Sequence, residues 1–402
     1  MSKLQLGVIF GSRSCEHEVA IVSAVQLMRH ADPARYDVIP VYIAQDGAWW
    51  TGEALKDIAT FVPAFDKAKP GLMPVQPDLT AKSGALLHFE RQGLKGLGRQ
   101  RIAARLDVVI PVMHGLHGED GTLQGLLELM DIPYASSGVA ASAVAMDKIL
   151  MKQVFRSYGF PVLQDIAVLR SQWQIDAIGM IKDIEARLPY PVFVKPANLG
   201  SSIGVSRATD FLSLKDALEL AFSFDRRVLV EVGVDSPIEV NCAVLGYDQD
   251  VRASVVEMPV TGGDLLDFSA KYLGGGGGAK GMASLSRVVP APIGDEMTAK
   301  IQSLSMEVFR ALDCKGVVRI DWMIAPATDS LTITEINAIP GSLAFYLWAQ
   351  SEPRLDYSQL IDQMVKAALQ AQHEKEENNL AHHSDILSKA TLGMKGSKGS
   401  KQ

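Results

Sequence analysis

The sequence is poor in cysteine. Among its 402 residues there are three cysteines, Cys15, Cys242 and Cys314, and they lie far apart without forming a CxxC pair. Such spacing argues against both a disulfide framework and a zinc site. It fits a protein of the reducing cytoplasm.

Long apolar runs are missing as well. The N-terminal stretch MSKLQLGVIFGSRS starts directly with a short strand pattern and lacks the apolar segment of a signal peptide. No run approaches the length that spans a bilayer. The net charge is −7 and no basic stripe stands out, so there is no reason to expect nucleic acid as a partner. We therefore expect a soluble cytoplasmic protein without membrane or nucleic-acid partners.

The chain also lacks a P-loop. Its run GGGGGAKG places Lys280 between Ala279 and Gly281, whereas a P-loop requires a lysine followed by serine or threonine. Five consecutive glycines indicate mobility instead. We predict that residues 273–281 belong to a lid that closes over a reaction.

What remains is the composition of a globular protein with an α/β pattern. Hydrophobic residues make up 48% and charged residues 21%, and the length suggests two or three domains. Apolar runs at Leu4–Phe10, Val38–Ile43 and Asp107–Met113 predict strands, and helical patterns begin at Glu16 and cover Thr122–Met130. Residues 51–105 are poorly patterned, and we interpret them as insertion and connecting loops.

The second half has its own series of predicted elements after a composition shift near 140–150. We expect helices over 148–158, 213–222, 295–311 and 356–370, and strands over 228–232, 316–324 and 331–337. The polar tail 373–402 cannot bury enough apolar surface to fold alone.

The segments GVVRIDWMI (316–324) and LTITEIN (331–337) form the strongest candidate site. The short loop between them predicts an antiparallel hairpin with Asp321 opposite Glu335. By strict alternation Leu331, Ile333, Glu335 and Asn337 share one face, so a carboxylate and an amide follow two apolar residues there. Two close carboxylates repel unless a cation lies between them, and all-oxygen ligands suit Mg²⁺. The alternative is an edge hairpin with solvated acids.

Three further stretches are candidate ligand sites, each with a structural alternative. VFVKPANLGSSIG ends a strand at Lys195 and could cradle phosphate with its amides and with Ser201 and Ser202, or it could be a plain turn. HGLHGEDG (114–121) follows a strand where α/β sheets bind ligands, or it caps the next helix. Glu16 in CEHEV lies at a similar edge, or it serves as a favourable charge at a helix N-terminus.

Together these stretches resemble the D-alanine–D-alanine ligase family of the ATP-grasp superfamily. HGLHGEDGTLQG is similar to the family's N-terminal signature, and GVVRIDWM…TEINAIPG is similar to its C-terminal one, with Trp322 and Ala338 as departures. MDK (146–148), VKP…GSSIG, VEVGVDSPIEV and DFSAKY follow the family's order between them. The resemblance covers nearly the whole chain to about residue 370.

The resemblance implies an α/β protein with the ATP-grasp fold. Its N-terminal open α/β (pre-ATP-grasp) domain would cover 1–143, its central α+β lid domain 144–230, and its C-terminal α+β domain, which carries the metal site, 231–372. A flexible tail, 373–402, would follow. The family's members also lead us to expect a homodimer.

The resemblance further implies ATP and two Mg²⁺ ions, or Mn²⁺, as cofactors. The implied metal ligands are Asp321, Glu335 and Asn337. Lys148 and Lys195 would contact the ATP phosphates, Lys271 the γ-phosphate, and Glu239 the ribose, with adenine at Glu231 and the Val234 backbone. The implied ATP-binding residues are Lys148, Lys195, Ser201, Ser202, Glu231, Val234, Glu239, Lys271 and Met323.

The implied reaction joins two D-alanines through an acyl phosphate, as a step of peptidoglycan synthesis. Glu16 would bind the ammonium of the first D-alanine beside a hydrogen-bonded set with Ser201 and Tyr272. Arg319 and the Gly341 amide would stabilise the tetrahedral oxyanion. His114 would lie near the second substrate.

One segment departs from the family pattern. The family commonly has a serine after its Pro-Gly, which binds the carboxylate of the second substrate together with a neighbouring amide, whereas PGSLAFYLW places Tyr346 there, before Leu347. A phenol can still donate a hydrogen bond, but the pocket is reshaped. The alternatives are therefore a sister ligase that adds D-serine or D-lactate, or another dipeptide ligase; Tyr272 argues against the lactate type. A non-catalytic nucleotide-binding protein would have lost metal or lysine positions, and none is lost.

Overall fold

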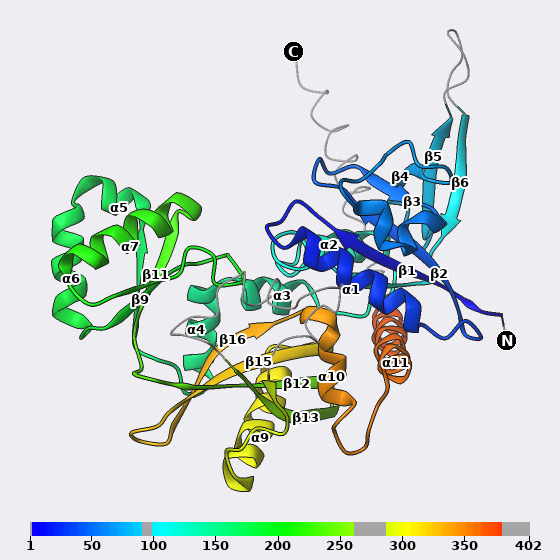
Figure 1. Cartoon of the computed structure of the whole chain (residues 1–402). Coiled ribbons are helices and arrows are strands. Elements are labelled where there is room, and N and C mark those ends of the chain that lie inside the picture. The colour runs from blue at the N-terminus through cyan, green and yellow to red at the C-terminus, as the bar shows by residue number, and fades with distance from the viewer. Residues whose placement is uncertain (1, 91–98, 261–286, 380–402) are drawn as a thin grey trace, which may run out of the picture.

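The computed structural model describes residues 2–90, 99–260 and 287–379. Three β-sheets with flanking helices follow one another along the chain (Figure 1). Within the described residues no helix combines the length and the apolar character needed to cross a bilayer.

The first unit is a seven-stranded sheet in the order β6-β5-β4-β3-β2-β1-β7. Its parallel part comprises β1 (Leu4–Gly11), β2 (Tyr36–Ile43) and β7 (Val108–Val112), with helices α1 (His17–His30), α2 (Thr122–Met130) and α3 (Val139–Met146). The predicted strands and the first two helices of this part are thus confirmed. Because β1 lies between β2 and β7, the strand order reverses there, and the loops after β1 and β7 meet at one edge.

The prediction that residues 51–105 form only loops is wrong. Antiparallel strands extend the sheet there: β3 (Trp49–Thr51), β4 (Met73–Pro77), β5 (Ala85–Glu90) and β6 (Arg99–Arg105), with short 3-10 helices η1 (Glu53–Lys56) and η2 (Ile58–Phe61). Strand β6 lies at the sheet edge and is mostly exposed, so its sequence RQRIAAR needs no apolar alternation. Pairing with a neighbour, and not its own hydrophobic pattern, makes it a strand.

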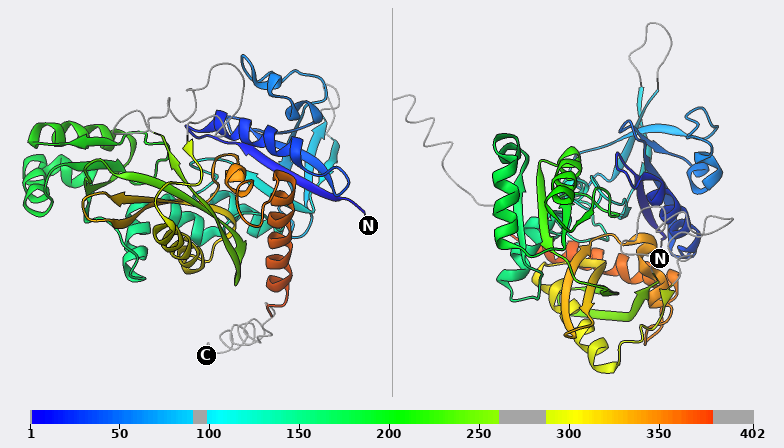
Figure 2. Two further views of the ribbon diagram at one scale, coloured as in Figure 1. Left: turned by 60° about the horizontal axis from the view of Figure 1, so that its bottom comes forward. Right: turned by 60° about the vertical axis from the view of Figure 1, so that its left-hand side comes forward.

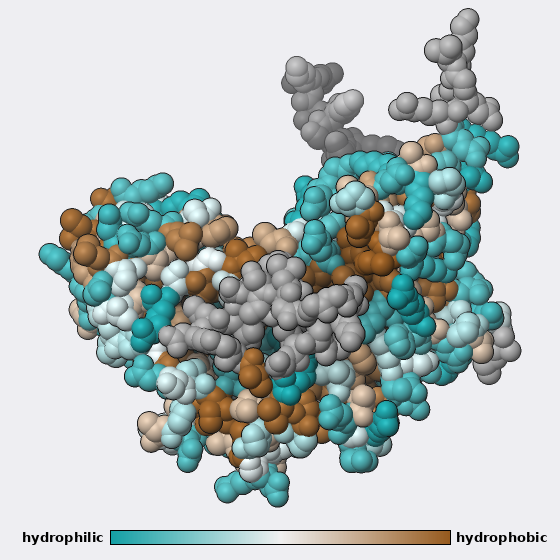
Figure 3. Space-filling model, in the orientation of Figure 1, coloured by the Kyte–Doolittle hydropathy of each residue, from teal (hydrophilic) through white to brown (hydrophobic). Residues whose placement is uncertain are grey.

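The second unit is a four-stranded antiparallel sheet in the order β10-β9-β11-β8. It lies on the opposite side of the molecule from the seven-stranded sheet (Figure 2). Helix α4 (Lys148–Ser157) precedes it. The unit comprises β8 (Asp165–Leu169), α5 (Arg170–Ile175), α6 (Ala177–Arg187), β9 (Val192–Pro196), β10 (Ser206–Ala208), α7 (Phe211–Phe224) and β11 (Arg227–Val232). The expected boundary between 230 and 231 falls inside β11. Apolar side chains are scattered among polar ones over this unit, seen at the upper left in Figure 3.

The third unit is a five-stranded antiparallel sheet in the order β14-β13-β12-β15-β16. Its elements are β12 (Ile238–Tyr247), β13 (Asp250–Pro259), β14 (Arg287–Val288), α9 (Asp295–Ala311), β15 (Lys315–Ala325), β16 (Ser330–Asn337), η4 (Gly341–Ala344), α10 (Phe345–Trp348) and α11 (Tyr357–Glu376). Helix α9 and the two final strands match the predicted ranges closely.

Helix α11 continues past 373, where the sequence predicts that the tail begins. Lys375 donates a hydrogen bond to Glu128 (2.6 Å) and lies 3.1 Å from Asp131, and Gln372 donates to Asp131 (2.9 Å). These contacts with the end of α2 stabilise four further helical residues.

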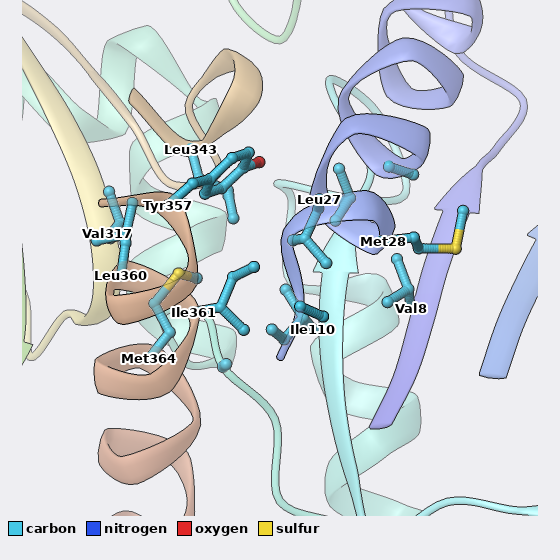
Figure 4. Packing of buried hydrophobic residues seen from close by; sticks show 14 of the residues in the cluster. Val8, Leu27, Met28, Ile110, Val317, Leu343, Tyr357, Leu360, Ile361 and Met364 are labelled. Carbon is cyan, nitrogen blue, oxygen red and sulfur yellow. The ribbon is translucent and has the colours of Figure 1, made fainter. Parts of the chain in front are cut away.

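The largest core joins the first and third units. Figure 4 shows Val8, Leu27 and Ile110 on one side facing Leu360, Ile361 and Met364 of α11 on the other. All these side chains are buried. Burial of apolar surface therefore fixes the N-terminal sheet against the C-terminal helix and places the edge after β1 and β7 beside the end of β16.

Candidate active site

A cavity of about 360 Å³ lies where the three units meet. It brings together most of the residues singled out from the sequence, although they come from distant segments. Those that line it are Glu16, His114, Lys148, Lys195, Ser201, Ser202, Glu231, Val234, Glu239, Arg319, Asp321, Met323, Glu335, Asn337 and Gly341. Tyr346 and Leu347 do not line it. Lys271, Tyr272 and the predicted lid 273–281 lie outside the described residues.

The buried Glu16 carboxylate lines the cavity. The Ser201 hydroxyl donates a hydrogen bond to it, and Ser14 links the loop after β1 to the loop after β7 by donating to the His114 carbonyl (2.7 Å). Glycines make room for the carboxylate, because a Cβ atom would come within 2.6 Å of Glu16 Oε2 at Gly115 and 2.8 Å at Gly200. Two glycine-containing loops thus close around one buried acid.

Glu119 is a site residue that the sequence reasoning did not select individually. It lines the cavity, and its two oxygens accept the backbone N–H groups of Gly115 (2.8 Å) and Ile339 (2.9 Å). Burial, with the nearby charge of Glu16, raises the pKa of Glu119 to about 8. Its position in HGEDG was the available signal, but sequence alone cannot show that it reaches the turn after β16.

The predicted hairpin is confirmed, with Asp321 paired to Glu335 and Arg319 to Asn337. Arg319 donates two hydrogen bonds to the Asp321 carboxylate, both at 2.6 Å, and Asn337 Nδ2 donates a third at 3.1 Å. Burial lowers the pKa of Arg319, but the Asp321 charge outweighs it and holds that pKa above its usual value. The acidic face is therefore charged and partly neutralised by Arg319.

The expectation that Leu331, Ile333, Glu335 and Asn337 share one face is wrong. Trp322 pairs with Ile333 while Asp321 pairs with Glu335, so Thr334 is an extra residue in a β-bulge. Leu331, Ile333 and Ile336 pack in the core, whereas Glu335 and Asn337 line the cavity. The bulge turns the end of β16 over and directs its polar residues toward the cavity.

The hairpin offers two carboxylates and one amide oxygen to a cation. Elsewhere in the described part of the chain, as here, no three or more His, Cys, Asp or Glu side chains gather closely enough to hold a metal. Since Asn337 directs its amide nitrogen to Asp321, its oxygen is left to face away from that carboxylate. This all-oxygen set fits a hard divalent cation that completes its shell with phosphates or water.

A buried ion-pair network also lines the cavity, through Glu231 and Lys195. The Glu231 carboxylate accepts from Lys195 and lies 2.5 Å from the Nζ atom of Lys152, which is itself buried. Although burial raises the pKa of Glu231, these two ammonium groups lower it to about 2. Sequence reasoning missed Lys152, which follows Lys148 by one helical turn and gave no separate signal.

Lys148 lies between the glycine-serine loop and the acidic hairpin. Its Nζ atom donates to the Leu199 carbonyl (2.6 Å) and lies 3.9 Å from Glu335 Oε2. An ammonium group in this position can bind a phosphate that lies between the glycine-serine loop and the acidic hairpin.

Tyr346 is placed differently from what its predicted role requires. Its hydroxyl donates to Glu257 (3.0 Å), which also accepts from Asn241 (3.1 Å) and from Arg287 (2.9 Å), whose guanidinium lies 3.8 Å from the centre of the Tyr346 ring. Glu257, Asn241 and Arg287 line the cavity. They were missed because they lie on strands β12, β13 and β14 without a motif.

Comparisons with known proteins agree with this geometry. The family model described as D-ala D-ala ligase N-terminus matches residues 5–137, and the one described as D-ala D-ala ligase C-terminus matches 154–366. The chain is 35% identical over 373 residues to the D-alanine–D-alanine ligase of Thermosipho africanus, covering 92% of this chain and 95% of that protein. It is 36% identical over 389 residues to that of Acetivibrio thermocellus, covering 92% and 96%.

Solved structures are similar over the same length. The D-alanine–D-alanine ligase from Coxiella burnetii matches with a TM-score of 0.77 and 25% identity, covering 94% of this chain and 97% of that one. The D-Ala:D-Ser ligase VanG from Enterococcus faecalis matches with a TM-score of 0.75 and 28% identity, covering 91% and 100%. The chain therefore belongs to the D-alanine–D-alanine ligase family, whose members are ATP-using ligases with the ATP-grasp fold.

Proposed function

We propose that this enzyme joins two D-alanine molecules to D-alanyl-D-alanine at the expense of ATP, releasing ADP and phosphate. The observation that carries the proposal is the convergence in one cavity of Glu16, Lys148, Arg319 and the Asp321–Glu335 pair. Glu16 can bind an amino group, Lys148 can bind a phosphate chain, and Arg319 can stabilise charge at an acyl centre.

The first half of the reaction transfers the γ-phosphoryl group of ATP to the carboxylate of the first D-alanine. Glu16 binds the ammonium group of that substrate and orients its carboxylate toward the hairpin. Lys148 and Lys195 hold the phosphates, while Glu231, Val234 and Glu239 hold the nucleoside. Positioning and charge neutralisation supply most of the rate in such transfers.

The second half forms the peptide bond. The amine of the second D-alanine attacks the acyl phosphate, and the oxyanion of the tetrahedral species accepts from Arg319 and the Gly341 amide. Phosphate then leaves and the attacking nitrogen loses a proton. Ser201, Ser202 and Met323 line the same cavity and exclude water from the reactive acyl group.

Divalent cations belong to the proposal too. Asp321, Glu335 and Asn337 would hold Mg²⁺ or Mn²⁺ in two sites. When bound, the ions neutralise the charge of the phosphates and orient them. Lys271 and Tyr272 keep the roles that the resemblance implies, at the γ-phosphate and beside Glu16.

For the second substrate, D-serine is an alternative to D-alanine. VanG is described as a D-Ala:D-Ser ligase. Tyr346 here takes the position of the family's usual serine and donates its hydroxyl proton to Glu257. A ligase that adds D-serine is thus the second candidate. Backbone amides near Leu347 remain the proposed partners of the second carboxylate, with His114 close by.

The test is phosphate release from ATP with Mg²⁺ across D-alanine, D-serine and D-lactate, offered singly and in pairs, with product identification by mass spectrometry. Turnover with D-alanine alone supports the proposal. Turnover only with a mixed pair selects the sister activity, and no turnover with D-alanine in any combination refutes both.

We further propose that the enzyme acts in the cytoplasm, because ATP is a cytoplasmic substrate, and that its product is a peptidoglycan precursor. We also propose that it is a homodimer, as the family resemblance implies. For the domains we keep 1–143 as the first, extend the central one to Val232, the end of β11, and end the third near 376, the end of α11. Sedimentation velocity tests the dimer.

A further inference from the structure

The turn after β16 adopts a backbone conformation that L-residues rarely take. Ser342, Leu343 and Ala344 have φ angles of 50°, 53° and 50°, one after another, and none of them is glycine. Left-handed residues of this kind cost energy individually and persist only where surrounding structure holds them. The turn follows Gly341, which lines the cavity.

Side chains of the N-terminal unit hold this turn. Glu119 Oε1 accepts the Ile339 N–H (2.9 Å), and His114 Nδ1 lies 2.9 Å from the Ile339 carbonyl. Ser23, on α1, accepts the Ser342 N–H at its Oγ (3.2 Å), and the same Oγ lies 3.0 Å from His114 Nε2. The segment leading into the turn and the first residue of the turn are thus tied to residues more than 200 positions away.

The donor and the acceptor of each of these hydrogen bonds can be assigned. A carbonyl can only accept, so His114 Nδ1 must carry the proton that bonds Ile339. Burial lowers the pKa of His114 and favours the neutral ring, so Nε2 accepts the proton of the Ser23 hydroxyl. The Ser23 oxygen then receives the Ser342 N–H, and the chain of donors starts and ends on the same turn.

Packing supports the same geometry. Leu343 and Ala344 are fully buried in the cluster that contains Ala24 and Leu27 of α1. Figure 4 shows Leu343 beside Tyr357 of α11, with Leu27 facing them across the core. Helix α1 therefore contacts the turn through both apolar and polar side chains.

We propose that Ser23 is a positioning residue of this enzyme: it holds the left-handed turn 342–344 so that the Gly341 amide points at the reacting acyl group. The inference rests on the proposed ligation for its catalytic part. It is distinct from substrate binding, since Ser23 does not line the cavity.

The test compares Ser23→Ala with Ser254→Ala. Ser254 is a similarly buried serine whose hydroxyl oxygen accepts the Ala243 N–H (3.0 Å) and whose hydroxyl donates to the Val255 carbonyl (2.7 Å), both on the third sheet. We expect Ser23→Ala to lower kcat at least tenfold while the KM for ATP changes less than twofold, because the nucleotide end of the cavity is untouched. Ser254→Ala is expected to keep kcat within threefold of the unmodified protein.

A rescue variant separates positioning from general destabilisation. Glycine takes positive φ without strain, so Ala344→Gly reduces the need for Ser23. In the Ser23→Ala background it is expected to raise kcat at least threefold over that of the single Ser23→Ala variant. If Ser23→Ala does not fold, the double variant is measured instead, and its failure to fold overturns the proposal.

Hydrogen–deuterium exchange of a peptide covering 338–347 gives a readout that does not depend on activity. Ser23→Ala should speed its exchange at least tenfold, with little change in β12 and α11. If the unmodified protein forms no dipeptide, the proposed function fails while exchange still tests the turn. Unchanged exchange, unchanged kcat in an active enzyme, or no rescue by Ala344→Gly overturns the role of Ser23.

Discussion

Tyr346→Phe distinguishes two roles for the residue that departs from the family pattern. If its hydroxyl binds the second substrate, as the sequence suggests, loss of the hydroxyl raises the KM for that substrate about ten- to a hundredfold and leaves stability unchanged. In the structure, however, the buried hydroxyl donates to the Glu257 carboxylate at 3.0 Å. Its removal should then weaken the fold more than it weakens substrate binding.

The magnitude follows from the partners of Glu257. The carboxylate keeps Asn241 and Arg287 as donors in Tyr346→Phe, so it loses one of three charged hydrogen bonds. Such a bond is worth about 1.5–3 kcal/mol. For 402 residues, an unfolding entropy of about 2 cal/mol/K per residue converts this to a Tm lowered by roughly 2–4 °C.

The assay combines thermal melting with initial rates against D-alanine, fitted with separate constants for its two sites. Tyr357→Phe is the matched control, because the buried Tyr357 hydroxyl has no hydrogen-bond partner among the described residues and its loss should leave Tm unchanged or raised. A Tyr346→Phe enzyme with unchanged Tm and a KM raised tenfold at one site would refute the structural reasoning and restore the hydroxyl as a substrate ligand.

Three further outcomes are expected. Glu335→Gln should abolish ligation without a change in Tm. Asp321→Asn should abolish ligation and also lower the free energy of unfolding by about 3 kcal/mol, because Arg319 loses its buried counter-ion. Calorimetry measures the stability and phosphate release measures the activity, and residual activity above a hundredth of normal contradicts the metal role. Chelation with EDTA should stop phosphate release, and Mg²⁺ or Mn²⁺ should restore it; turnover in excess chelator contradicts the cation requirement. The pKa of Glu231 is lowered to about 2 from an ordinary 4.5, so its ionisation contributes stability that is complete above pH 4.5 and is lost as the pH falls toward 2. Lys152→Met should therefore have a lower Tm than the unmodified protein at pH 6 and nearly the same Tm at pH 2.5. A Tm difference that stays constant with pH would contradict the ion pair.

Local sequence patterns predicted much of the fold. Helices over 122–130 and 295–311 were predicted with the bounds that the structure has, because both have a clear apolar periodicity. The hairpin and its Asp321–Glu335 pair were predicted from a five-residue loop, although the strands pair as Ala325–Ser330 next to the loop and reach the Asp321–Glu335 pairing only through the bulge at Thr334. These features depend on neighbours in the chain, and neighbours are visible in a sequence.

Other features depend on contacts between distant segments. Strands β4 to β6 form because β3 offers an edge to pair with, so 51–105 showed no pattern of its own. The bulge at Thr334 turns Glu335 and Asn337 away from the core side of the strand, which strict alternation cannot foresee. Side chains without a motif, such as Lys152 and Glu257, gained a role only from the partners that the fold brings to them.

Residue type and spacing were enough to identify the family, the acidic hairpin and the order of the ligand-binding segments. The packing of the three units sets which groups meet: Glu119, His114 and Ser23 hold the turn at Gly341, and Tyr346 bonds Glu257 instead of lining the cavity. The physical reason is that buried polar groups must find partners, and which partners lie within 3 Å is set by how the three units pack around a shared core.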